Sequence, residues 1–236
     1  MQLDPQFILT AFLDLFKALP LTLLITAVSL IGGFIIALPV ALVRIHRVPV
    51  LRQLASAYVT VIRGTPMLMH LFLIYYGLPI LIDALARKFG FDYTAASIPI
   101  VYFVFIAFSL TAGAYMSEVI RSGIQAVDRG QVEAAYSVGM TPIQTFRRII
   151  LPQALAVSLL NLSSEVIGML HGTTLAFTVS ITEINARANI IASTNWKFFE
   201  AYIAAALMFW GLTVIIERVT ARIERKINTF NRGGVA

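Results

Sequence analysis

The sequence predicts an all-α protein that crosses a membrane with five helices, and two observations carry this prediction. Of its 236 residues, 58% are hydrophobic and only 13% are charged, with a mean hydropathy of +0.83. A soluble domain carries about 25% charged residues. Apolar stretches near the length of about 20 residues that spans a bilayer recur along the whole chain. A soluble globular domain and a disordered chain are therefore excluded.

Five apolar stretches are the expected spans. Three of them are nearly free of charge, and two contain polar residues that interrupt the apolar pattern. In chain order they are Pro20–Val43, Ala55–Ile82, Ile98–Met116, Pro152–Ile184 and Phe198–Ile216. The second contains an Arg-Gly-Thr-Pro run at 63–66, and the fourth contains Glu165 and His171. Because the spans fill the chain, residues 1–236 are expected to form a single membrane domain.

Residues 1–18 are expected to form a short helix that lies on the membrane surface. Phe7, Ile8, Ala11, Phe12, Leu15 and Phe16 recur at helical spacing. The segment does not have the basic start of a cleaved signal peptide, because Asp4 and Asp14 precede Lys17. The alternative is that it extends the first span.

The basic residues predict the orientation of the chain. The 18 Lys and Arg residues exceed the 12 Asp and Glu residues, and the pI is about 9.8. Such an excess can indicate nucleic-acid binding, but here 12 of the 18 lie on one side of the five spans and 5 on the other. Because cytoplasmic loops are enriched in Lys and Arg, the N-terminus is expected outside and the C-terminus inside. No nucleic-acid partner is expected.

Cysteine and histidine usage limits the chemistry. The chain has no cysteine, so disulfides, thiol catalysis and thiolate metal sites are excluded. Its three histidines are widely separated in the sequence and predict no metal site. No cofactor of its own is expected.

The largest inner loop, 117–151, has the pattern of two helices joined by a tight turn. Good helix formers run from Gln131 to Val138, and Gly139 can end that helix in a left-handed conformation. Thr141 and Pro142 then offer an N-cap and a first-turn proline for a second helix. Such an element suits docking of a cytosolic partner, and an ordinary loop is the alternative.

The same loop resembles the EAA loop of ABC importer permeases. The matching residues are Glu133, Ala134, Ala135, Gly139, Phe146, Leu151 and Pro152. Residues 63–66 with 73–79, and residues 114–123, resemble the polar amino-acid subfamily of these permeases. The chain is thus similar to five-span, MetI-like type I permeases.

This resemblance implies partners and a location. A permease of this family works as a homodimer or heterodimer in the lipid of the bacterial inner membrane, with two cytosolic ATPase subunits and an extracytoplasmic solute-binding protein. The segment Glu133–Gly139 is then the coupling helix that enters a cleft of the ATPase. The chain has no G-x-x-x-x-G-K-[ST] phosphate loop. It is therefore expected not to be an enzyme, with ATP and Mg²⁺ held by the partner.

Ionisable residues inside spans are candidate substrate ligands. Glu165 lies 13 residues after Pro152, which is roughly 20 Å along a helix, and its carboxylate suits an amino group. Alternatively, a polar neighbour holds it in a structural role. Arg63 is a further candidate that either pairs with Glu118 or Glu165 or extends to the cytoplasmic face. A local ion pair is expected between Glu118 and Arg121.

The sequence after His171, with Thr173 and Thr174, resembles cystine-type permeases. These three residues are candidate substrate ligands, while Gly168 and Gly172 also form a GxxxG pattern typical of close helix packing. The predicted substrate is cystine or another polar amino acid, with cationic amino acids such as arginine or histidine as the alternative. An ion-coupled carrier without ATP and an intramembrane enzyme are remote alternatives from other classes.

Overall fold

The computed structural model describes residues 3–232, and every regular element in that range is helical. The first half contains α1 (Pro5–Leu15), α2 (Leu19–Ile45), α3 (Leu51–Gly64), α4 (Met67–Phe89), the 3₁₀ turn η1 (Ala95–Ser97) and α5 (Ile100–Gln125). The second contains α6 (Arg129–Ser137), α7 (Pro142–Thr145), the π-turn η2 (Phe146–Ile150), α8 (Leu151–Gly172), the 3₁₀ segment η3 (Thr173–Val179), α9 (Ile184–Asn195) and α10 (Phe198–Arg232).

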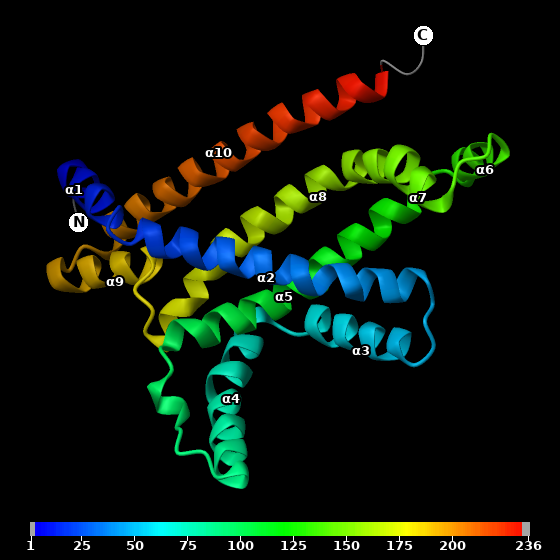
Figure 1. Ribbon diagram of the computed structural model, residues 1–236. Helices are drawn as coiled ribbons and strands as arrows, with labels where there is room; N and C mark the ends of the chain where they lie inside the picture. Colours follow the sequence, from blue (N-terminus) through cyan, green and yellow to red (C-terminus); the bar gives the residue numbers. More distant parts are fainter. Residues whose placement is uncertain (1–2, 233–236) are drawn as a thin grey trace.

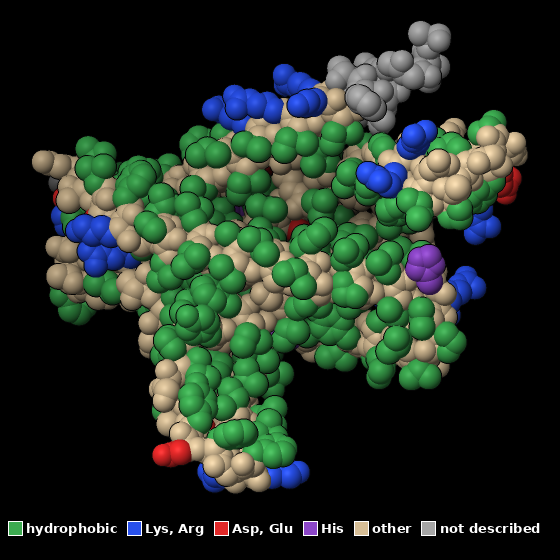
Figure 2. All heavy atoms as spheres, viewed as in Figure 1, with side chains coloured by type: hydrophobic (Ala, Val, Ile, Leu, Met, Phe, Trp, Pro, Cys, Tyr) green, Lys and Arg blue, Asp and Glu red, His purple; other side chains and the backbone are tan. Residues whose placement is uncertain are grey.

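Long helices run along the molecule, with α6 and α7 at one end and α1 and α9 at the other (Figure 1). Within the described range, 5 helical segments are long and apolar enough to cross a membrane: Leu19–Ile45, Met67–Phe89, Ile100–Gln125, Pro142–Val179 and Phe198–Ile227. The predicted fold class and number of spans are confirmed. Apolar side chains cover much of the visible midsection, and Lys and Arg gather mainly toward the ends (Figure 2).

The expected second span, Ala55–Ile82, is wrong as a single helix. The helix is interrupted at Thr65, which has an extended backbone with φ −126° and ψ 151°, and α4 begins after Pro66. Proline disfavours the helical conformation of the residue before it, which explains the break. The segment long enough to span is α4, while α3 has only 14 residues.

The expected fourth span, Pro152–Ile184, ends earlier than predicted. Helix α8 tightens after Gly172 into the 3₁₀ segment η3, which ends at Ser180 with a left-handed φ of 64°. The hydroxyls of Thr173 and Thr178 each donate to the carbonyl three residues earlier at 2.7 Å. Such local bonds compete with regular α-helix and suit the tighter turn.

The core that holds the spans together lies between α2, α4, α5 and the end of α8 with η3. Its buried members include Ile25, Leu71, Val104 and Phe108. Helices α2 and α5 approach closely because Gly33 carries no side chain: a Cβ placed there would lie 2.5 Å from the Cβ of Ala112. Small residues allow this kind of contact between membrane helices.

Helix α1 is a separate element rather than an extension of the first span, because a turn at 16–18 divides it from α2. Its inner face packs against α9 and α10 through a second apolar cluster. Two ion pairs hold it: Asp4 contacts Lys197 at 2.5 Å and Asp14 contacts Arg187 at 2.6 Å. A hydrogen bond from Lys17, and to a smaller extent one from Arg187, lowers the pKa of the Asp14 carboxyl group. A position of α1 on the membrane surface stays a prediction.

Candidate functional site

A cleft of about 340 Å³ lies between α3, α5 and α8. The last turn of α3 contributes Arg63, and α5 contributes Tyr115 and Glu118. Helix α8 contributes Asn161 and Glu165, which share a face because they are four residues apart. The cleft therefore brings together two of the predicted substrate residues, Arg63 and Glu165, from segments about 100 positions apart in the sequence.

Glu165 and Arg63 face the same cleft without pairing directly. Among the described side chains, the Glu165 carboxylate makes no hydrogen bond and no ion pair, although the charge of Arg63 acts on it. The Arg63 guanidinium lies over the Tyr115 ring, 5.5 Å from its centroid, in a cation–π contact. One carboxylate and one guanidinium are thus held apart in one cavity within the span region.

The negative charge of the other acid of the cleft, Glu118, is compensated by ion pairs with two arginines. Its carboxylate accepts from Arg121, with Nη2 at 2.7 Å and Nε at 3.1 Å, which confirms the predicted local ion pair. Arg44, at the end of α2, also pairs with Glu118. This contact was not predicted, and its sequence signal is only that both charges lie at the same end of neighbouring spans. Glu118 is therefore not the partner of Arg63.

Of the predicted ligands, His171 lies at the end of α8 and Thr173 and Thr174 at the start of η3, and none of them lines the cleft. The His171 Nε2 lies 3.2 Å from the Thr213 hydroxyl of α10. Thr173 is fully buried and donates to the Leu170 carbonyl, and Thr174 donates to the His171 carbonyl, each at 2.7 Å. A substrate role for these three stays a prediction.

The GxxxG pattern on α8 serves close packing at only one of its two glycines. A Cβ at Gly172 would lie 3.0 Å from the Met67 side chain at the start of α4. A Cβ at Gly168 would meet nothing within 4 Å of the described atoms. Gly172 therefore leaves room for the end of the Met67 side chain, next to the α3–α4 break.

A buried histidine, which sequence reasoning left without a role, also fixes this break. His70 is 5% exposed. Its Nε2 lies 2.7 Å from the Thr65 hydroxyl, and its Nδ1 lies 3.0 Å from the Thr111 hydroxyl of α5. Since Thr65 follows Arg63 by two residues, this chain of bonds positions the turn that presents Arg63 to the cleft. A lone histidine in an apolar run gives little signal for such a role.

The loop between α5 and α8 has the expected helix–turn–helix form. Helix α6 ends before Gly139, which has a φ of +78°. Thr141 then caps α7 in a reciprocal capping box with Gln144. Of the EAA residues, Ala135 is buried whereas Glu133 and Ala134 are exposed. Three apolar side chains of the loop are also open to solvent: Tyr136 at 49%, Val138 at 78% and Ile143 at 71% exposure.

Residues 29–229 match the family described as the inner membrane component of binding-protein-dependent transport systems. The chain therefore belongs to this family of permease subunits, which are multi-pass proteins of the bacterial inner membrane. These subunits pair with a second permease and with the ATPase that holds and hydrolyses ATP, and they have no ATPase site of their own.

Similar proteins extend over nearly the whole chain. It is 40% identical over 228 residues to the probable amino-acid ABC transporter permease protein PatM of Vibrio harveyi, covering 97% of this chain and 98% of PatM. It is 37% identical to the L-cystine transport system permease protein TcyL of Bacillus subtilis, covering 89% and 85%. A solved structure of an amino acid ABC transporter with histidines matches with a TM-score of 0.79 at 32% identity, covering 96% of this chain and 100% of that one.

Proposed function

We propose that this chain lines the translocation path of an amino-acid importer, with the substrate held in the cleft between Glu165 and Arg63. The observation that carries the proposal is the pair of opposite charges that line one cavity of about 340 Å³ without pairing with each other. The Glu165 carboxylate suits an α-ammonium group, and the Arg63 guanidinium suits an α-carboxylate. Amino-acid transport by similar permeases supports the same assignment.

The charge balance of the cleft favours a substrate with no net charge. A cationic amino acid would need a second unpaired carboxylate, and Glu118 is engaged by Arg44 and Arg121. Cystine or another zwitterionic polar amino acid is therefore preferred, which agrees with the similarity to TcyL. Cationic substrates are the second candidate, favoured by the unpaired Glu165. His171, Thr173 and Thr174, whose substrate role stays a prediction, lie outside the lining of this cleft.

The segment Glu133–Gly139 is the proposed contact with the ATPase. It lies at one end of the molecule (Figure 1), where Tyr136, Val138 and Ile143 leave apolar surface uncovered. The capping box and the left-handed Gly139 give the turn a defined shape. Closure of the ATPase pair on ATP would act through this segment on α5 and α8, which line the cleft, and so switch access between the two sides.

The proposed orientation puts α6 and α7 in the cytoplasm and α1 with α9 on the outer side. The 12-to-5 distribution of Lys and Arg supports this orientation. A solute-binding protein would then deliver the substrate at the α1–α9 end.

Uptake by the reconstituted complex tests the substrate assignment. Glu165→Gln keeps the side-chain size and removes the charge. The expected drop in uptake is tens to thousands of fold, because loss of a buried charge contact costs about 2–5 kcal/mol. Glu200→Gln, in the first turn of α10, is the matched control and should transport normally. Normal uptake by Glu165→Gln, with normal recovery of the complex, would exclude this carboxylate as a ligand.

A further inference from the structure

A second polar cavity, of about 400 Å³, lies at the arginine-rich end of the molecule. Five arginines line it, and they come from four helices and the α2–α3 turn. Arg44 lies in the last turn of α2, Arg47 in the α2–α3 turn, Arg52 in the first turn of α3, Arg121 near the end of α5, and Arg129 at the start of α6. Such convergence of guanidinium groups is not required by the substrate cleft, which lies between α3, α5 and α8.

The positive charge of this cavity is largely uncompensated. Among the described residues, Glu118 is the one carboxylate that pairs with any of the five, and it contacts Arg44 and Arg121. Arg47, Arg52 and Arg129 form no ion pair with a described side chain. Like charges held together repel one another. An anion with several oxygens would relieve this repulsion.

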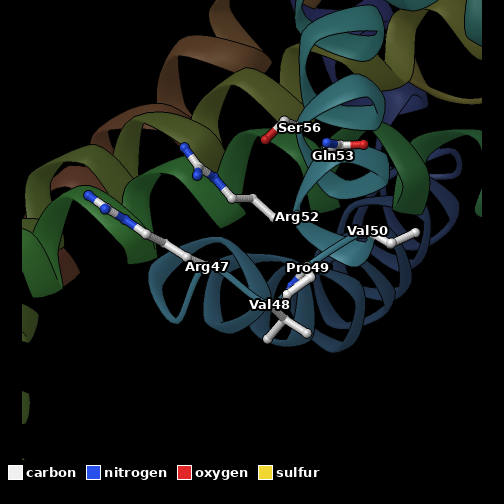
Figure 3. A pocket seen from close by; sticks show the side chains of 7 residues that line it. All are labelled: Arg47, Val48, Pro49, Val50, Arg52, Gln53 and Ser56. Atoms are coloured by element: carbon white, nitrogen blue, oxygen red, sulfur yellow. The ribbon is translucent and has the colours of Figure 1, made fainter.

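The backbone of the α2–α3 turn adopts an unfavourable conformation that places two of these arginines together. Arg47 and Val50 have φ values of 54° and 63°, in the left-handed region that β-branched residues in particular avoid. In Figure 3, which draws an adjoining cavity, the Arg47 and Arg52 side chains extend in the same direction. Arg47 and Arg52 thus both line the two cavities, as does Ser56.

The surface beside the arginines is apolar. Val50, Leu51 and Leu54 are 67%, 51% and 63% exposed. The apolar span α2 ends at Ile45, so we expect this surface where the hydrocarbon region meets the head groups. A basic cavity next to exposed apolar side chains is the arrangement that receives a lipid head group and its acyl chains.

We propose that this cavity binds the phosphate of an anionic phospholipid head group. Guanidinium groups match phosphate oxygens in paired, planar contacts. Arg47 supplies these contacts from the α2–α3 turn, Arg52 from the first turn of α3, and Arg129 from the start of α6. The acyl chains lie along Val50, Leu51 and Leu54. Because the lipid joins α2 and α3 to α5 and α6, it stabilises the region through which α6 connects to the cleft.

Lipid binding to the purified transporter complex tests this site. The complex is delipidated and exposed to vesicles of phosphatidylglycerol and phosphatidylcholine in equal amounts, and native mass spectrometry counts the lipids retained. The Arg47→Gln/Arg52→Gln double variant should bind phosphatidylglycerol about 30-fold more weakly, which corresponds to about 2 kcal/mol for two arginines. Arg218→Gln/Arg222→Gln, which removes two exposed charges from α10, is the matched control and should bind like the wild type.

Two outcomes would overturn the proposal. Equal retention of phosphatidylglycerol by the wild type and by both variants would show that the cavity does not hold the lipid. A thermal stabilisation by millimolar inorganic phosphate as large as that by phosphatidylglycerol vesicles would show that the ligand is a free anion rather than a lipid. Stabilisation by the lipid alone, lost in Arg47→Gln/Arg52→Gln, is the expected result.

Discussion

Replacing Glu183 with Gln should remove a pH dependence from the thermal stability of the protein. Glu183 has no exposed surface and lies between the fourth and fifth spans. Its carboxylate caps α9 by accepting from the backbone N–H groups of Asn185 and Ala186, each at 2.8 Å. Burial raises its pKa from 4.5 to about 7, although both N–H donors act in the opposite direction.

The stability falls as the pH rises because the pKa of Glu183 is raised in the folded protein. The folded protein holds this proton more tightly than the unfolded chain, so the contribution to stability is complete below pH 4.5 and is lost as the pH rises to about 7. This difference between the ordinary pKa and the folded-state pKa corresponds to about 3 kcal/mol of folding stability, at 1.36 kcal/mol per pKa unit. Glu183→Gln stays neutral at every pH and therefore lacks this loss.

Thermal unfolding of the detergent-solubilised complex between pH 5 and pH 8 measures the effect. The wild-type Tm should fall across this range more steeply than that of Glu183→Gln. Asp14→Asn is the matched control, because the Asp14 pKa is lowered and its contribution changes only at more acidic pH. If the Tm of Glu183→Gln falls as steeply as that of the wild type between pH 5 and pH 8, the Glu183 carboxyl group does not titrate in this range.

Three further predictions concern coupling, orientation and packing. Gly139→Arg should uncouple ATP hydrolysis from uptake or release the ATPase, and wild-type uptake with full recovery of the complex would contradict the docking assignment. In intact cells an impermeant thiol reagent should label Ser97→Cys but not Ser137→Cys, and the reverse pattern would invert the orientation. Gly33→Leu should lower the Tm, because even a Cβ there would lie 2.5 Å from the Cβ of Ala112 on α5, and overpacking costs about 1–3 kcal/mol. Gly77→Leu is the control and should leave the Tm unchanged, because a Cβ at Gly77 would meet nothing within 4 Å.

The fold was predictable where a local pattern determines it. Apolar length identified all five spans, and Gly139 with the Thr141–Pro142 pair identified the turn in the inner loop. The break in the second span was less predictable, because its effect depends on a proline inside an apolar run and on bonds from His70 to Thr65 and to α5.

The candidate site was predictable in its residue types but not in its pairings. Glu165 stood out because an ionisable side chain is costly within a span. Glu165 and Arg63 line the same cleft only because α3, α5 and α8 pack together, and no local sequence pattern predicts that packing. For the same reason the sequence indicated the local pair of Glu118 and Arg121 but not the contact with Arg44, which comes from another span.

In the proposed site, Glu165 binds the ammonium group and Arg63 the carboxylate of one amino acid. The most direct measurement is competition for uptake by two analogues of the substrate, one without the amino group and one without the carboxylate, in the wild type, Glu165→Gln and Arg63→Gln. We expect Glu165→Gln to lose discrimination against the analogue without the amino group, and Arg63→Gln to lose discrimination against the analogue without the carboxylate. If both variants discriminate as the wild type does, the substrate is not held between these two charges.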